Sequence, residues 1–209
     1  MNIQSKWRKK MPRTPEQFEA LREKSQQKIL RAALECFANN GFHTTSMNTI
    51  AKQAGISVGL IYNYFESKNA LLQAIILDGC TQISGMFEMP EDTTNPYEKM
   101  RVLLDAYFTS LRENIEFWKL YSRLLVQPDV MQALQETLAT VFAEIFSWLE
   151  AYFQAIDAED PQSEAKVLGA IFDGIGLHYM LDPEHYPLDA VKQLLLQKYA
   201  QPLHSGETS

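Results

Sequence analysis

A short polar cluster in the first third of the chain carries residue types that bind nucleic acid. Tyr62, Asn63 and Tyr64 are consecutive, with Ser57 five residues before them and Lys68 four residues after. Hydroxyl and ammonium groups donate hydrogen bonds to phosphate oxygens, and an asparagine amide can pair with the edge of adenine. Three consecutive helical positions cannot all face inward. The cluster therefore favours an exposed DNA-contacting surface, although for any single tyrosine a place in the core is an equal alternative.

Two short helices joined by a glycine must position this cluster. Ser46 precedes a predicted helix over residues 47–54, Gly55 makes the turn, and Ser57 precedes a second predicted helix over residues 58–65. A serine at such a position accepts a hydrogen bond from an early helix amide, and glycine tolerates the positive φ of a turn. The spacing predicts a helix-turn-helix, in which the first helix braces the second in the DNA major groove.

The second helix divides into an inward and an outward side. Ile61 and Phe65 are four residues apart and anchor the helix to the core. The outward side comprises Ser57, Val58, Gly59, Tyr62 and Asn63, with Tyr64 at its edge. Thr45 and Ser46, at the start of the bracing helix, and Lys68, at the start of the next helix, are predicted to meet phosphates.

Helical periodicity extends over the whole chain and indicates an all-α protein. The 209 residues are 46% hydrophobic with nine glycines and nine prolines, and apolar residues recur at intervals of three and four. About nine helices are expected. The first, over residues 16–39, has an apolar stripe of Phe18, Leu21, Ile29, Ala33, Leu34 and Phe37.

The chain is predicted to have five segments. They are a basic N-terminal arm (1–15), a three-helix helix-turn-helix domain (16–66), a connecting helix (67–87), a helical-bundle domain for ligand binding and dimerisation (88–202), and a tail (203–209). The prolines and polar residues of 88–96 indicate the loop between the two main parts.

Charge is distributed unevenly along the chain. Residues 1–84 contain 11 Lys and Arg against 6 Asp and Glu, whereas residues 85–209 contain 8 against 20, within a net charge of −7. A basic front on an acidic body suits a nucleic-acid surface at one end, although chance segregation of solvated charges is an alternative. The basic residues of the arm either track DNA phosphates or belong to a disordered tail.

These features together resemble the TetR family of bacterial transcriptional regulators. The resemblance rests on Ala33, Phe37, Gly41-Phe42, Thr45-Ser46, Ile50-Ala51, Ala54-Gly55-Ile56-Ser57, Gly59, Ile61-Tyr62, Tyr64-Phe65, Ser67-Lys68 and Leu71-Leu72. It implies DNA contacts from Thr45, Ser46, Asn48, Ser57, Val58, Gly59, Leu60, Tyr62, Asn63, Tyr64 and Lys68. Val58 stands where the family often has a basic residue, and Tyr64 where it often has histidine, so the second helix offers less positive charge than usual.

The resemblance further implies a homodimer that binds a palindromic DNA operator and responds to a small-molecule effector, usually as a repressor. The last two helices should form the dimer interface, and three glycines within 169–176 suit close helix packing or a ligand against the backbone. Interface candidates, for which intrachain core is the alternative, are Leu168, Ile171, Phe172, Ile175, Tyr179, Val191, Leu194, Leu195 and Lys198.

The middle helices supply the candidates for an effector pocket. Aromatic side chains could line an apolar cavity, and a few charged groups could anchor the ligand. The candidates are Arg101, Asp105, Trp118, Tyr121, Phe142, Phe146, Phe172 and His178. Ordinary packing is the stronger alternative for an aromatic stripe on a helix.

Enzymatic and metal-binding patterns are absent from the sequence. It has no phosphate-binding glycine loop, no paired Cys-x-x-Cys and no His-Glu-x-x-His, so neither a cofactor nor a metal is expected. Cys36 and Cys80 are expected to be reduced and buried. No apolar run is long enough for a membrane span and no signal peptide is evident, which favours a cytoplasmic protein. The alternatives to a regulator are a helical protein–protein adaptor and a small-molecule enzyme.

Overall fold

The computed structural model describes residues 14–202, so most of the predicted basic arm and the whole predicted tail lie outside the described residues. Within residues 14–202 the chain forms nine helices and no strand, which confirms the all-α prediction. The helices are α1 (Pro15–Asn40), α2 (Met47–Ala54), α3 (Val58–Tyr62), α4 (Lys68–Gly85), α5 (Pro96–Glu113), α6 (Ile115–Leu125), α7 (Pro128–Ala155), α8 (Pro161–Leu181) and α9 (Leu188–Tyr199).

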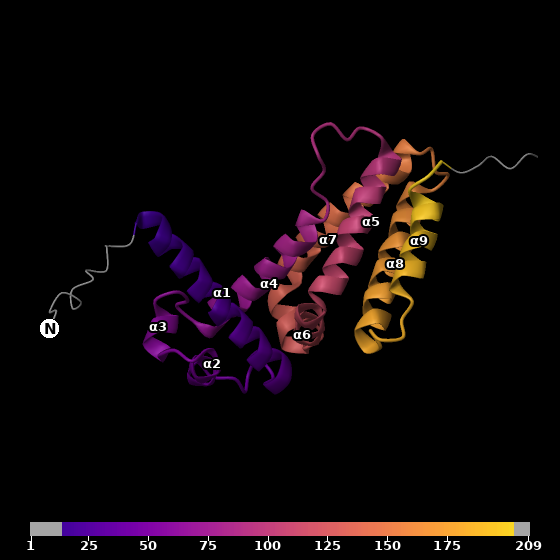
Figure 1. Ribbon diagram of the computed structural model, residues 1–209. Coiled ribbons are helices and arrows are strands. Elements are labelled where there is room, and N and C mark those ends of the chain that lie inside the picture. The colour runs from indigo at the N-terminus through magenta and orange to yellow at the C-terminus, as the bar shows by residue number, and fades with distance from the viewer. Residues whose placement is uncertain (1–13, 203–209) are drawn as a thin grey trace, which may run out of the picture.

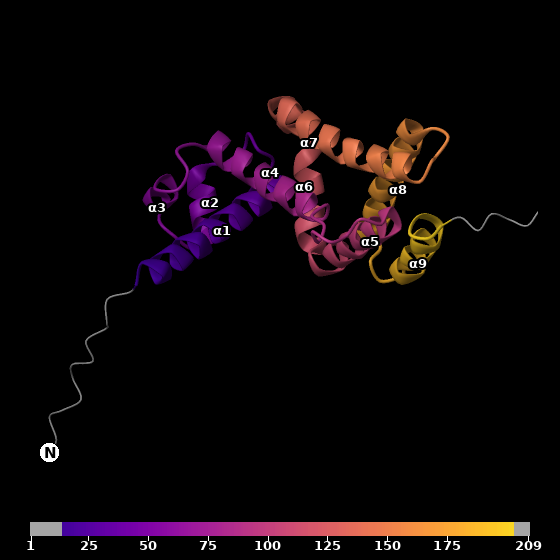
Figure 2. The same cartoon turned by 90° about the horizontal axis from the view of Figure 1, so that it is seen from above.

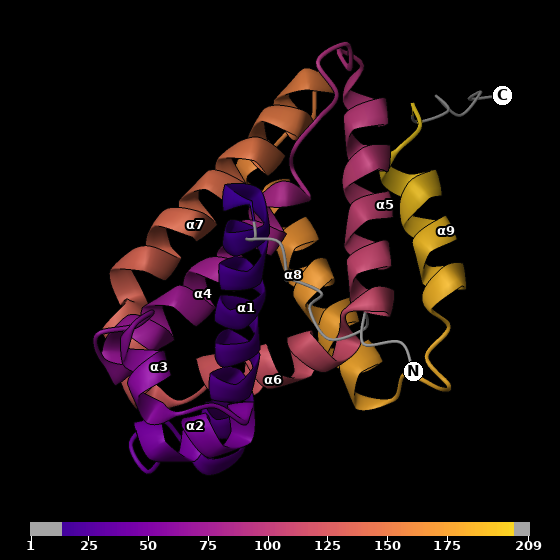
Figure 3. The same cartoon turned by 60° about the vertical axis from the view of Figure 1, so that its left-hand side comes forward.

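The helices form a small head and a larger bundle. Helices α1–α3 lie together at one end, and α4 leads from them toward the bundle (Figures 1 and 2). In the bundle, α7 packs against α8 and α5 packs against α9, while α6 crosses beneath them and contacts α1 (Figure 3). We call α1–α3 the head and α5–α9 the regulatory region. The two parts meet where α1 of the head contacts α6 of the regulatory region. Helix α4, which connects them, contacts both α1 and α7.

The first half of α1 extends beyond the part of the helix that α2 and α3 cover. Thr14 caps the helix in a reciprocal capping box with Gln17, but the buried core begins only at Ile29. Phe18 is 59% exposed and Leu21 is also exposed, so the prediction that both belong to the core stripe is wrong. The physical reason is length: α2 and α3 have eight and five residues and cover only part of a 26-residue helix.

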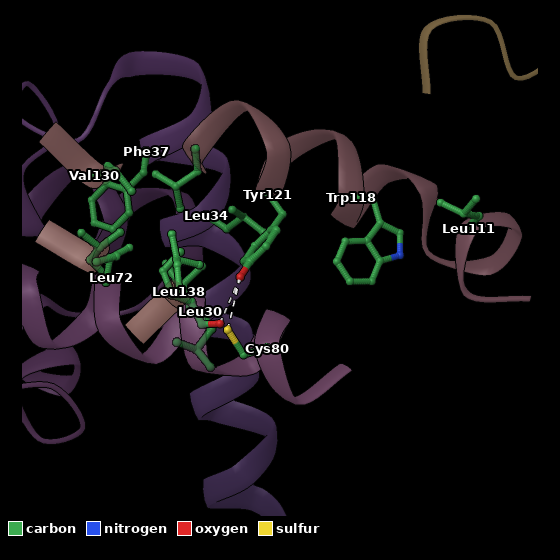
Figure 4. Packing of buried hydrophobic residues seen from close by; sticks show 14 of the residues in the cluster. Leu30, Leu34, Phe37, Leu72, Cys80, Leu111, Trp118, Tyr121, Val130 and Leu138 are labelled. Atoms are coloured by element: carbon green, nitrogen blue, oxygen red, sulfur yellow. Dashed lines mark hydrogen bonds between the residues drawn. The ribbon is translucent and has the colours of Figure 1, made fainter. Parts of the chain in front are cut away.

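One continuous hydrophobic core joins the head to the regulatory region. Phe37 and Leu34 of α1, Leu72 of α4 and Val130 of α7 belong to the same buried cluster (Figure 4). Leucine and phenylalanine buried in such a cluster contribute roughly 1.5–3 kcal/mol each. A displacement of the regulatory region therefore disturbs packing against the head.

Helices α4 and α6 are held together by Tyr121 and Gly79. The Tyr121 ring lies so close to Gly79 that an added Cβ would overlap it, which explains a glycine in the interior of α4. The Tyr121 hydroxyl donates to the carbonyl of Ile76 over 3.1 Å and lies 3.9 Å from the sulfur of Cys80 (Figure 4). Burial raises the pKa of Tyr121 well above its ordinary value, so this donor stays protonated.

Candidate nucleic-acid interface

The turn between α2 and α3 has the geometry that the sequence predicts. The Ser46 hydroxyl accepts from the amide of Thr49 over 3.1 Å, and the Ser57 hydroxyl accepts from the amide of Leu60 over 3.2 Å. Gly55 has φ 63° and ψ 40°, a left-handed conformation that side chains disfavour. Each helix therefore begins at a serine cap, and Gly55 sets the angle between them.

Helix α3 is shorter than predicted. It ends at Tyr62 instead of Phe65, because the chain then tightens into bonds between residues three apart. The amide of Asn63 donates to the carbonyl of Leu60 over 3.2 Å, and that of Tyr64 to Ile61 over 2.9 Å. The tightened turn leaves Asn63 exposed and Tyr64 half-buried.

The outward face of the head contains most of the residues predicted to contact DNA. Ser46, Asn48, Ser57, Gly59 and Asn63 are exposed. Tyr62 is 52% exposed, whereas its neighbour Ile61 is fully buried. Val58 and Leu60 are half-buried at the edge of this face, and a Cβ at Gly59 would meet no atom within 4 Å. Within residues 14–202 no other part of the chain covers this face, which has hydroxyl and amide groups for phosphates and bases.

The structure corrects the prediction for the Thr45 side chain. Thr45 is only 3% exposed, and its hydroxyl lies 2.8 Å from the carbonyl of Gly41 and 3.2 Å from that of Cys36. A buried polar group needs such partners. Thr45 therefore closes the end of α1 and does not present its side chain to DNA.

The Lys68 side chain also makes contacts within the chain. Its ammonium group donates to the carbonyls of Phe42, Thr45 and His43 over 2.8, 3.0 and 3.1 Å, and it lies 4.6 Å from the centroid of the Phe42 ring. An ammonium group has three donors, and all three are used here. Lys68 thus organises the loop between α1 and α2, residues 41–46, which we call the α1–α2 loop. Its phosphate contact stays a prediction, and forming it would require the ammonium group to give up some of these bonds.

The regulatory region contacts the same loop from the other side, which sequence reasoning missed. The Gln127 amide accepts from the amide of Phe42 over 3.0 Å and donates to the carbonyl of Phe37 over 2.9 Å. His43 lies 3.0 Å from the Asp129 carboxylate. These partners are 85 to 90 positions apart in the sequence, so no local pattern could indicate them.

The predicted effector residues do not form one site. Arg101 donates to the carbonyl of Ala200 over 3.2 Å and Asp105 pairs with Lys192 over 2.7 Å, so both join α5 to α9. The other predicted residues are distributed over separate contacts or the surface. Trp118 and Tyr121 are buried, Phe146 packs on Gly169, the Phe172 ring contacts the Tyr107 ring at a tilt, and Phe142 and His178 are exposed.

A cavity of about 600 Å³ lies between the head and the regulatory region. None of the eight predicted effector residues lines it. Its walls come from α1, α4, the end of α5 and α6: Gln27, Lys28, Leu30, Arg31, Leu34, Ile75, Asp78, Gln82, Glu113, Asn114, Ile115, Glu116, Phe117 and Leu120. Sequence reasoning missed these residues because the cavity arises from the crossing of helices far apart in the chain.

Four of the nine residues predicted for the dimer interface face inward. Leu168, Ile175, Tyr179 and Leu195 are buried within the chain, so they are intrachain core, the alternative reading of these positions. Ile171, Phe172 and Val191 are half-buried, whereas Leu194 and Lys198 are exposed. Helix α8 instead exposes Val167, Leu177 and Leu181. The helix is apolar on both sides, so periodicity could not tell the inner face from the outer one.

The three glycines of α8 have different surroundings. A Cβ at Gly169 would lie 2.8 Å from the Phe146 ring, and one at Gly176 would lie 3.3 Å from the Tyr107 hydroxyl. Gly174 faces open space. Two glycines therefore serve intrachain packing, and the third lies on the outer side of the helix.

Comparison with known proteins assigns both parts of the chain. Residues 29–75 match the bacterial regulatory proteins of the tetR family, and residues 96–202 match the C-terminal region of BetI-type transcriptional repressors. The second match alone covers more than half of the chain. This protein is a TetR-family transcriptional regulator. The resemblance inferred from the helix-turn-helix residues is thus confirmed.

Individual relatives agree with this assignment. Over 63 residues the chain is 48% identical to the regulator UidR of Escherichia coli K12, a match covering 30% of this chain and 32% of UidR, so the chain spans about a third of that relative. PksA of Bacillus subtilis is 25% identical over 84% of this chain and 88% of its own. The structure of FadR from B. subtilis in complex with stearoyl-CoA has a TM-score of 0.66 and 23% identity, covering 85% of this chain and 99% of FadR, and shares the fold.

Other classes of site find no support in the described residues. Within residues 14–202 no group of three His, Cys, Asp or Glu is placed to hold a metal ion. No helix in that range is long and apolar enough to cross a membrane.

Proposed function

We propose that this TetR-family regulator is a ligand-responsive repressor that acts as a homodimer on a palindromic operator in the cytoplasm. The observation that carries the proposal is the uncovered outer face of the head, with Tyr62 and Asn63 exposed beside the buried anchor Ile61. Ser46, Asn48, Ser57 and Gly59 extend the proposed DNA contact, and Val58, Leu60 and Tyr64 border it. Thr45 and Lys68 support the face from inside.

The proposed dimer forms through the outer side of α8 and α9. Val167, Leu177 and Leu181 of α8 and Leu194 of α9 are large apolar side chains exposed in the single chain. Gly174 lies on this side and would let a second helix approach closely. Two heads joined in this way can reach successive major grooves about 34–36 Å apart, which a twofold operator requires.

The proposed effector site is the cavity between α1, α4 and α6. Its volume of about 600 Å³ falls within the range of small-molecule sites, roughly 300–1,000 Å³. Its floor is apolar and includes Leu34, Ile75 and Leu120. Because α1 belongs to the head and α6 belongs to the regulatory region, a ligand bound between these two helices would alter the orientation of the head. Binding of a ligand by a fold relative, FadR with stearoyl-CoA, supports an effector in general terms.

Selection of bound fragments from a genomic library tests the proposal. We expect recovered fragments to share an inverted repeat, and binding to weaken steeply with salt because phosphates are neutralised. Recovery of no preferred sequence at any salt concentration would refute the proposed function. The genes beside the recovered fragments would indicate the class of effector.

A further inference from the structure

The α1–α2 loop is fixed by two side chains from different parts of the molecule. Lys68, at the start of α4, bonds to three carbonyls of the loop. Gln127, immediately before α7, bonds to the amide of Phe42 and to the carbonyl of Phe37 at the end of α1. The loop leads directly into α2, so its position determines the orientation of the helix-turn-helix.

The Gln127 contact is bidentate and partly buried. One end of the amide group accepts a hydrogen bond and the other donates one, over 3.0 and 2.9 Å, so both position and angle are fixed. Phe42 is buried, and no other bond to its amide is found within residues 14–202. Loss of the Gln127 side chain would leave that amide unsatisfied, which is costly for a buried donor.

Two neighbouring contacts are weaker. His43 lies 3.0 Å from Asp129 but its side chain is 76% exposed, and Arg123 contacts the Asn39 side chain over 3.4 Å at the surface. Exposed polar pairs of this kind contribute little. The Gln127 amide is therefore the principal polar link between the turn after α6 and the head.

We infer that Gln127 is a positioning residue that transmits the state of the regulatory region to the reading head. Helix α6 ends at Leu125, two residues before Gln127, and α6 lines the cavity through Phe117 and Leu120. A shift of α6 would move the Gln127 amide, and with it the α1–α2 loop. The consequence for operator binding rests on the proposed function, whereas the mechanical link within one chain does not.

A distance measurement within single chains tests this link. We would attach nitroxide spin labels to two introduced cysteines at exposed positions, Lys52→Cys on α2 and Ala151→Cys on α7. The chain would also carry Cys36→Ala and Cys80→Ala, so that no native thiol is labelled. Mixing it with a large excess of unlabelled chain leaves at most one labelled chain per assembly. Double electron–electron resonance then measures the distance between the two labels of one chain. That distance reports how the head lies relative to the regulatory region, whether or not the protein dimerises.

We expect a narrow distance distribution for the labelled parent and a clearly broader or shifted one for Gln127→Ala. Gln127→Glu keeps the acceptor but loses the donor to Phe37, so it should give an intermediate distribution. A carboxylate before α7 also favours that helix, so an effect of Gln127→Glu would not reflect fraying of α7. Gln132→Ala, on the exposed side of α7, is the matched control and should resemble the parent.

Operator binding supplies the second readout. Gln127→Ala should weaken binding to a selected fragment about tenfold, within the usual range of coupling between sites, while circular dichroism shows an intact helical fold. Unchanged distance distributions in both Gln127 variants would overturn the inference. Failure of the proposed function would appear separately, as absence of sequence-selective DNA binding by the parent protein.

Discussion

The head and the regulatory region are both helical, yet they depend on sequence in different ways. In the head, the caps, turn and anchor residues all fall within residues 46–65, and the bonds that cap its two short helices, such as Ser57 to Leu60, are local. In the regulatory region the decisive contacts join distant positions, such as Tyr107 with Phe172 or Arg101 with Ala200. The comparison teaches that short-range sequence signals specify the helix-turn-helix. The contacts that position it depend instead on how helices far apart in the sequence cross.

The largest effect should come from the outer face of α8. Leu177→Asp places a charge in the proposed dimer contact, and burying an unpaired charge costs several kcal/mol. We expect a folded monomer in sedimentation analysis and loss of operator binding. Leu77→Asp is the matched control, because Leu77 is 55% exposed, close to the 53% of Leu177, but lies on α4. An unchanged dimer in Leu177→Asp would place the interface elsewhere.

Gly79→Ala should destabilise the junction between the two regions. The added Cβ would overlap the Tyr121 ring, and overpacking of this kind costs about 1–3 kcal/mol. Thermal or urea denaturation would measure the loss. Gly85→Ala, in the same helix with open space around it, should be neutral or slightly stabilising because alanine is the better helix former. Equal stability of both variants would contradict the packing described for α4 and α6.

Lys68→Met distinguishes support of the head from contact with DNA. The variant keeps an apolar stem but loses three hydrogen bonds, which should lower the free energy of unfolding by about 2 kcal/mol. Lys52→Met, at an exposed lysine of α2, is the control. Normal stability combined with a smaller salt dependence of DNA binding would restore the phosphate contact that the sequence suggested.

Tyr62→Ala should do the opposite of Lys68→Met: it should weaken operator binding and leave the stability nearly unchanged. Because Tyr62 is exposed, stability should change by less than about 0.5 kcal/mol, while operator binding weakens about tenfold, or about 1.4 kcal/mol. Tyr62→Phe separates the hydroxyl from the ring. Unchanged affinity of Tyr62→Ala, measured by fluorescence anisotropy, would remove Tyr62 from the proposed interface.

The smallest effect is expected at the free end of α1. Phe18→Ser alters a side chain that no part of the described core covers, so the free energy of unfolding should change by less than about 0.5 kcal/mol. A loss above about 2 kcal/mol on chemical denaturation would show that another part of the assembly covers this end.

These contrasts explain what could be read from the sequence. Periodicity identified the helices and the serine caps identified the starts of α2 and α3, since those signals act over a few residues. Periodicity alone could not say which side of α8 faces inward, nor that none of the helices in residues 14–202 covers the first half of α1. The loop contacts of Lys68 were missed because its partners lie 23 to 26 positions earlier, in a loop without regular structure.

Hydroxyl-radical footprinting of a selected operator tests the central claim most directly. Two heads on a twofold dimer should protect two equivalent backbone patches about 34–36 Å apart, or a multiple of that spacing. Tyr62→Ala should weaken both patches equally, and Leu177→Asp should abolish the pair. A single patch without twofold symmetry, or protection unaffected by Tyr62→Ala, would contradict the account.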